Sequence, residues 1–177
     1  MTRRESGALA RAQGIAWEAQ VLADLEAERR RGMLTAWWRL TEETRQVRRG
    51  EKIGTVRVDG GGGLPDFLAF APGVAWAIEV KHAACERWSL SGLTADQALH
   101  LTEWMDPPHR RSGVVLALHP PGQGRTATLL DWLVLGPVWS LWYQGEAGRG
   151  GASLSVSDAL ELGVPWDGGR ALVGGAK

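Results

Sequence analysis

Three side chains in the middle of this chain could do chemistry together: Asp66, Glu79 and Lys81. Residues 66–70 and 74–81 are apolar apart from these groups, and the short segment between them carries Pro and Gly, which predicts a β-hairpin. Because side chains alternate along a strand, Glu79 and Lys81 point to the same face of the sheet. The spacing therefore places a carboxylate and an ammonium group side by side near one end of the hairpin.

The hairpin also predicts which residues face each other. If its turn is centred between Pro72 and Gly73, the numbers of opposed residues sum to 145, which places Asp66 across from Glu79. Two carboxylates so close repel each other unless a cation or a proton lies between them. Oxygen ligands without Cys or clustered His favour Mg²⁺, with Mn²⁺ as a substitute. On spacing alone, an ion pair between Lys81 and either acid explains the pattern equally well.

A divalent cation at this position would polarise a phosphate group and lower the pKa of a bound water molecule. Lys81 would then orient that water or stabilise the charge that develops on phosphorus. The pattern thus favours hydrolysis of a phosphodiester.

A third carboxylate, Glu18, lies on a helix predicted over residues 7–31. The apolar stripe of this helix is expected to run through Ile15, Glu18, Leu22 and Leu25. A carboxylate within such a stripe needs a partner, and the metal site is one candidate. Alternatively, Glu18 lies at the edge of the stripe and reaches water.

Charge is unevenly distributed, although 20 basic residues balance 20 acidic ones. Residues 1–57 carry twelve Lys or Arg and eight Asp or Glu, and the remainder carries eight and twelve. The excess peaks within residues 41–57, at Arg45, Arg48, Arg49, Lys52 and Arg57. A basic segment beside an acidic remainder fits a protein that holds phosphates at one place and metal ions at another. A solvated surface stretch explains the same charges equally well.

The order of the elements predicts a single α/β domain over residues 1–177, with helices around a mixed sheet. Further elements are expected as a helix at 95–105, strands at 114–118 and 126–135, and a helix at 137–143. The Gly-rich residues 168–177 are expected to form a loose tail. No apolar run approaches the roughly 20 residues of a membrane span, so we expect an intracellular protein without a membrane partner.

Pro65-Asp66, followed by a hairpin and Glu79-Val80-Lys81, resembles the motif of the PD-(D/E)XK nuclease superfamily. Over about residues 12–165 the chain is also similar to the RecU-type Holliday junction resolvases. That likeness is carried by Gly14 to Glu18, Ser89 to Leu101, Gly113 to Leu118 and Leu133 to Tyr143. It departs from the family at Gly60 to Gly63, where a Thr is usual near the first acid.

The resemblance implies a restriction-endonuclease-like core and a homodimer that cuts four-way DNA junctions symmetrically with Mg²⁺. In this interpretation the Val80 carbonyl, Asp66 and Glu79 hold the metal, and Glu18 completes or adjusts the site. The resemblance also places Gln97 near the active site, touching water or phosphate. Thr94 and Gln97 match a helix capping box as well, so both roles of Gln97 stay open.

We therefore expect a cytoplasmic endonuclease, bacterial or phage-encoded, in which Asp66, Glu79, Lys81 and Glu18 are catalytic. Phosphates of the junction would be held by Arg45, Arg48, Arg49, Lys52 and Gln97. A dimer contact is the preferred role for Trp37, Trp38, Trp139 and Trp142. No nucleotide cofactor is expected, because the glycine run lacks the Lys-Ser/Thr ending of a P-loop.

Two alternatives stay open. One is a restriction- or repair-type nuclease of the same superfamily that acts on duplex or flap DNA. The other belongs to a different class: an inactive module that only binds DNA junctions. Intact acidic and lysine residues argue against the second, because an inactive descendant is free to lose them.

Overall fold

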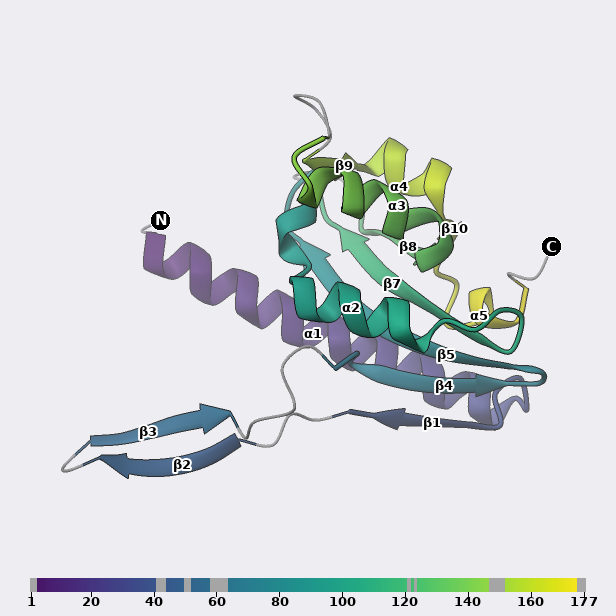
Figure 1. Ribbon diagram of the computed structural model, residues 1–177, viewed down its shortest axis with the longest axis horizontal. Helices are drawn as coiled ribbons and strands as arrows, with labels where there is room; N and C mark the ends of the chain where they lie inside the picture. Colours follow the sequence, from purple (N-terminus) through teal and green to yellow (C-terminus); the bar gives the residue numbers. More distant parts are fainter. Residues whose placement is uncertain are drawn as a thin grey trace.

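A twisted sheet between two layers of helices forms the body of the protein (Figure 1). The computed structural model describes residues 3–40, 44–49, 52–57, 64–120, 122, 124–146 and 152–174, without the side chains of 3–6, 44–49, 52–57 and 174. Within these residues, six strands form the central sheet in the order β1-β4-β5-β7-β8-β10. Strands β5 and β7 are parallel, and the other neighbours are antiparallel. The expected α/β fold with a mixed central sheet is therefore confirmed.

The helices are α1 (Arg3–Arg30), η1 (Leu90–Gly92), α2 (Ala95–Trp104), α3 (Trp132–Tyr143), α4 (Val156–Leu162) and α5 (Ala171–Gly174). The strands of the central sheet are β1 (Ala36–Arg39), β4 (Phe67–Ala71), β5 (Val74–Ala83), β7 (Arg110–Leu118), β8 (Thr126–Asp131) and β10 (Val164–Pro165). Two small sheets pair β2 (Thr44–Arg49) with β3 (Lys52–Arg57), and β6 (Arg87–Ser89) with β9 (Ser153–Ser155). None of the helices in the described part of the chain is long and apolar enough to span a membrane.

The β4–β5 hairpin has the predicted register. Pairs from Ala71↔Val74 to Phe67↔Ile78 all sum to 145. The turn holds because Pro72 presets its own φ, while Gly73 takes a φ of 81° that side chains disfavour. Strand β5 continues to Ala83, beyond the point where β4 begins, so in the described part of the chain no strand pairs with its last residues on that edge.

Helix α1 covers one face of the sheet and buries the stripe Trp17, Val21 and Leu25 against β5 and β7 (Figure 1). The expected stripe through Ile15 is wrong, since the Ile15 side chain is 69% exposed. A bulky Trp17 two positions later takes the buried place, and the stripe rotates with it. Glu18 therefore lies at the edge of the buried stripe, half-buried.

Helices α2, α3 and α4 cover the opposite face and pack on Val114, Leu116 and Leu118 of β7. The strand expected over residues 126–135 ends at Asp131, and the helix expected over 137–143 starts at Trp132. The Asp131 side chain accepts a hydrogen bond from the Leu133 backbone N–H and so begins the helix early.

The carboxy-terminal residues close the α1 face of the core. Ala171 and Leu172 are buried there, and the Trp76 indole N–H donates to the Leu172 carbonyl at 3.0 Å. The loose tail expected over 168–177 is therefore wrong for residues 168–174. The reason is that a short apolar segment after Gly169 fills the space between α1 and β5, while residues 175–177 lie outside the described part of the chain.

Candidate active site

The two acids of the motif meet where β5 runs past the start of β4. Residue Asp66 directly precedes β4, and its Oδ2 accepts a hydrogen bond of 2.7 Å from the Val80 backbone N–H. A side chain thus takes the place that a strand partner would have beyond the end of the hairpin. This bond holds Asp66 against the segment that carries Glu79 and Lys81.

Glu79 is buried, with 2% of its surface exposed. Its Oε1 pairs with Lys81 Nζ at 2.9 Å and accepts a hydrogen bond of 2.5 Å from Gln97 Nε2. Its Oε2 is buried and finds no hydrogen-bond partner among the residues that the structure describes. Burial, and next the charge of Asp66, raise the pKa of Glu79 to about 8, although Lys81 opposes the shift. A buried carboxyl group with one oxygen unpaired is suited to receive a ligand.

Asp66 is half-buried, and its pKa is raised as well. Burial is the main cause, and the charge of Glu18 adds to it, while the Val80 N–H acts in the opposite direction. The two acids therefore resist being charged together in the absence of a cation.

Gln97 joins the first turn of α2 to the site. Its Oε1 accepts hydrogen bonds from the Thr94 backbone N–H and from Lys81 Nζ, each at 3.1 Å. The Thr94 hydroxyl in turn accepts from the Gln97 backbone N–H, which completes a capping box. Gln97 thus caps the helix and also lies at the candidate site, because the cap leaves its amide N–H₂ available to Glu79. Its contact with water or phosphate stays a prediction.

Glu18 reaches the same site from α1, but its partner there is the guanidinium group of Arg39. Its Oε1 lies 2.5 Å from Arg39 Nη2, and the side chain is 25% exposed. Its charge still helps to raise the pKa of Asp66 and of Glu79. Glu18 thus influences the two buried acids from the rim of the site.

These groups surround a cavity of about 370 Å³ that opens between α1 and β5. Its lining also includes Arg11 and His82, which the sequence analysis did not single out, and Gly14 and Trp17 from the segment Gly14 to Glu18. For His82 the signal was its place directly after Lys81. For Arg39, the partner of Glu18, the sequence offered no signal, because the pairing of β1 with β4 is not visible in it.

The four basic residues expected to bind phosphates lie on the β2–β3 hairpin. Arg45 and Arg48 pair with Val56 and Ile53, and Arg49 pairs with Lys52 next to the turn. This hairpin forms its own two-stranded sheet and extends away from the central one (Figure 1). Their side chains lie outside what the structure describes, so their contact with DNA stays a prediction.

Comparisons with solved structures give distant likenesses. Among solved structures, the chain is similar to Hjc, a Holliday junction resolvase from the archaeal hyperthermophile Archaeoglobus fulgidus. The identity is 18% and the TM-score 0.46, over 83% of this chain and 94% of that one. No protein-family model matches the chain, and no curated protein matches it either.

The residues of the cavity fit a hard divalent cation. Asp66 and Glu79 supply carboxylate oxygens, and Val80, which directly follows Glu79, supplies a backbone carbonyl. The described residues do not gather three or more Asp, Glu, His or Cys side chains at one metal position. The fit rests instead on the unpaired Glu79 Oε2 and on two acids whose pKa values are both raised.

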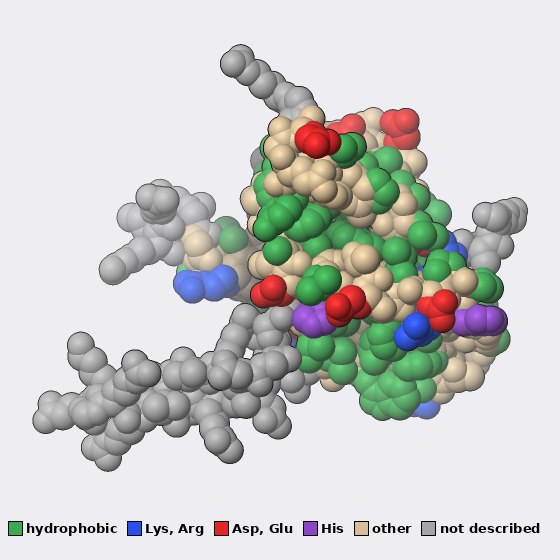
Figure 2. Space-filling view, viewed as in Figure 1, with side chains coloured by type: hydrophobic (Ala, Val, Ile, Leu, Met, Phe, Trp, Pro, Cys, Tyr) green, Lys and Arg blue, Asp and Glu red, His purple; other side chains and the backbone are tan. Residues whose placement is uncertain are grey.

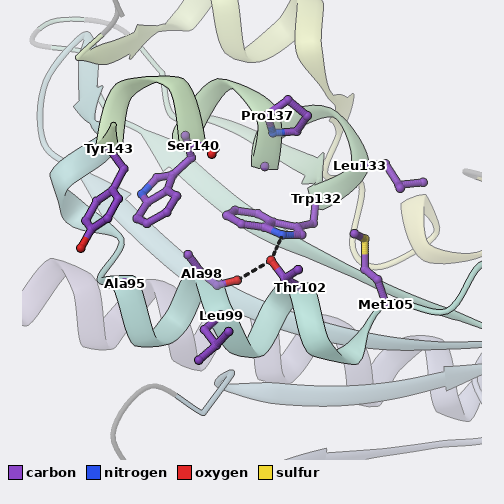
Figure 3. Close-up of a pocket in the computed structure, with 12 residues that line it drawn as sticks. Ala95, Ala98, Leu99, Thr102, Met105, Trp132, Leu133, Pro137, Ser140 and Tyr143 are labelled. Atoms are coloured by element: carbon purple, nitrogen blue, oxygen red, sulfur yellow. Dashed lines mark hydrogen bonds between the residues drawn. The ribbon is translucent and has the colours of Figure 1, made fainter. Parts of the chain in front are cut away.

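A second hollow lies on the other face of the molecule, between α2 and α3. This α2–α3 groove has a volume of about 550 Å³, and its walls are almost entirely apolar (Figure 3). Trp132 forms part of its floor and donates its indole N–H to the Thr102 hydroxyl at 2.9 Å. Leu99, Leu133 and Tyr143 stand exposed around it, and Figure 2 shows hydrophobic side chains gathered on this face.

The four tryptophans expected at a dimer contact range from buried to exposed. Trp139 is buried within its own chain and stacks on Tyr143, with ring centroids 4.8 Å apart. Trp38 is exposed on the edge strand β1. Trp37 and Trp142 are half-buried. Trp139, although buried, still lines the α2–α3 groove together with Tyr143.

Proposed function

We propose that this chain is a Mg²⁺-dependent endonuclease that hydrolyses DNA phosphodiesters, with four-way junctions as its substrate. The observation that carries the proposal is the buried Glu79 carboxyl, held beside Asp66 and Lys81 on an open cavity. Two acids and an ammonium group in such a place cost stability when they serve packing alone. Groups with strongly raised pKa values in a cavity are typical of active sites.

In this proposal Asp66, Glu79 and the Val80 carbonyl hold the cation. When bound, Mg²⁺ would polarise the scissile phosphate and provide an acidic water. Lys81 orients the attacking water or stabilises the charge developing on the phosphate oxygens. Its ammonium group is placed for this by hydrogen bonds to Glu79 and Gln97.

Gln97 and Glu18 position and tune the groups of the site, but do not themselves bind or activate the attacking water in this proposal. Gln97 fixes both Glu79 and Lys81 from a capped helix end, so their positions depend on α2. Glu18 adds negative charge at the rim and is balanced by Arg39. Its role is to adjust the affinity of the acid pair for a cation.

The choice of a four-way junction rests on the sequence resemblance to RecU-type resolvases and on the basic β2–β3 hairpin. A projecting hairpin that carries Arg45, Arg48, Arg49 and Lys52 is suited to follow phosphates into a branched substrate. Paired cuts need two active sites, so the proposal includes a two-fold dimer. The α2–α3 groove is our candidate for its interface, because it exposes apolar side chains without charge.

Cleavage of a four-way junction should be compared with cleavage of a linear duplex of the same sequence, in Mg²⁺. The proposal predicts symmetric nicks on two opposed strands of the junction, and much slower cleavage of the duplex. Equal cleavage of both substrates would favour a restriction- or repair-type nuclease. Binding of the junction without cleavage, over a range of Mg²⁺ and Mn²⁺ concentrations, would favour an inactive binding module.

A further inference from the structure

A row of His and Arg side chains borders the candidate active site on the α1 face of the sheet. His82 lies on β5, His119 directly follows β7, and Arg125 directly precedes β8. Strand alternation places all three on the face that Val80, Ala117 and Ala127 turn towards α1. They thus come from three neighbouring strands at one end of the sheet.

The strand register brings the three residues close together. The last pair of β7 and β8 is Leu118↔Thr126, so His119 and Arg125 follow as the next opposed residues. The His119 backbone N–H donates to the Ala83 carbonyl at 2.9 Å, which ties this end of β7 to β5. Across three strands the row spans about 10 Å. Such a width matches two to three nucleotides of one DNA strand.

Charge within the row is not balanced by acids. Arg125 and His119 form no ion pair with the carboxylates that the structure describes, and the same holds for Arg11. Both Arg125 and His119 are exposed. His82 is half-buried beside them, and its imidazole can donate an N–H to a phosphate oxygen.

Helix α1 joins this row to the cavity of the active site. The Arg125 guanidinium stacks over the Trp17 ring, 4.4 Å from its centroid, and Trp17 also lines the cavity. Arg11 and His82 line the cavity together with Glu79 and Lys81. One turn before Trp17, the buried Gln13 Oε1 lacks a partner among the described residues. The row is therefore continuous with the place where a phosphate would be cut.

We propose that Arg11, His82, His119 and Arg125 form a phosphate subsite, which binds a phosphodiester of the cleaved strand one to three nucleotides from the scissile bond. This inference rests on the proposed nuclease function and extends it to the path of the strand. Guanidinium groups bind phosphate oxygens through paired N–H donors. The guanidinium group of Arg125 is held in place by stacking on Trp17. The subsite fixes the strand so that one phosphate comes to lie over Asp66 and Glu79.

The test measures binding to junctions in which a single phosphate is replaced by a neutral methylphosphonate. Each of the three phosphates on either side of the cut is replaced in turn, and Asp66→Asn is the background that keeps the strand intact. Neutralising the phosphate at the subsite should weaken binding about three- to tenfold. With Arg11→Ala and Arg125→Ala added, the same replacement should have no further effect.

The double substitution should also lower the slope of log affinity against log salt by about two. Arg110→Ala is the matched control, because Arg110 lies at the opposite end of β7 and pairs with Asp106; it should leave the slope and the phosphate effect unchanged. Arg125→Lys keeps the charge and should retain most of the slope. Thermal unfolding of each variant shows whether loss of the Trp17 stack has disturbed the fold.

An unchanged phosphate effect and salt slope in a folded Arg11→Ala, Arg125→Ala variant would overturn the subsite. If the wild-type chain cuts junctions in that case, the nuclease proposal stands and only the subsite is lost. If the wild-type chain binds junctions but does not cut them, the nuclease proposal fails. The binding comparison still decides the subsite in that event, with phosphates counted from the branch point.

Discussion

Protonation of Glu79 should make the stability of the metal-free protein depend on pH. Its pKa of about 8 in the folded protein lies above its ordinary value of 4.5. Between these values the folded protein holds a proton that the unfolded chain has lost. The free energy of unfolding of the metal-free protein should therefore fall as pH rises through this window, by on the order of 5 kcal/mol in total.

Chemical unfolding in a chelator from pH 4 to pH 9 measures this loss. In Glu79→Gln the group cannot ionise, so the loss should be much smaller, and the difference between the two curves isolates Glu79. Mg²⁺ should stabilise the wild-type chain more at pH 8.5 than at pH 5, because the cation binds the charged form. Parallel curves for the two proteins would show that Glu79 keeps an ordinary pKa.

Gln97 offers a second prediction, because its two roles can be separated. Gln97→Ala and Thr94→Ala both break the capping box, and each should cost about 1 kcal/mol of stability. Only Gln97→Ala also removes the hydrogen bonds to Glu79 and Lys81. Its cleavage rate should fall about 10- to 100-fold, while Thr94→Ala keeps a rate close to wild type. Equal rates for the two variants would leave Gln97 as a helix cap only.

The closeness of Asp66 and Glu79 could be predicted from the sequence, because a two-residue turn fixes the register of a hairpin. The surroundings of Glu18 could not. Ile15 and Trp17 compete for the same side of α1, and the larger ring is buried while Ile15 stays exposed. The partner Arg39 comes from β1, whose register with β4 depends on packing.

At the scale of elements, α3 starts earlier than the sequence predicts, and the β2–β3 hairpin is not among the predicted elements. The apolar run before Pro137 suits a strand or a helix, and the Asp131 cap decides for the helix. Residues 44–57 carry few apolar side chains, so no buried face imposes a strand period on them. Their pairing is local and forms a sheet separate from the core.

The hairpin should contribute to DNA affinity without contributing to the stability of the core. We predict that four joint substitutions weaken junction binding and lower the salt slope by about three to four: Arg45→Gln, Arg48→Gln, Arg49→Gln and Lys52→Gln. Unfolding should be unchanged, because the hairpin forms its own sheet. A variant of equal charge serves as control: Arg30→Gln, Arg87→Gln, Arg110→Gln and Arg170→Gln. Equal losses in both variants would mean that only net charge matters.

At the scale of the whole molecule, the active-site cavity and the α2–α3 groove lie on different parts of the surface. The cavity opens beside α1, whereas the groove lies between the helices of the opposite face. Helix α2 contributes to both, with Gln97 in the cavity and Leu99 in the groove. Two chains joined through this groove would therefore place an active site close to each side of the interface.

Leu99→Glu and Leu133→Glu together should convert a dimer into a monomer, since each places a charge in the apolar groove. Analytical ultracentrifugation measures the mass of the assembly in solution. Mapping of the strands cut by the double variant should show nicks that are not paired across the junction. Leu160→Glu is the matched control: Leu160 is similarly exposed but lies on α4, outside the groove. A wild-type chain that is already monomeric, or a double variant that stays dimeric, would contradict this interface.

The central claim, that Asp66 and Glu79 perform metal-dependent hydrolysis of DNA, is tested most directly by cleavage of a four-way junction in Mg²⁺. The wild-type chain and an Asp106→Ala control should cut it, since Asp106 is an exposed acid remote from the cavity. Asp66→Ala should lower the rate at least about 1,000-fold, a loss of about 4 kcal/mol in transition-state stabilisation. A chelator should abolish cleavage by the active proteins. Cleavage by Asp66→Ala at the wild-type rate would contradict the account.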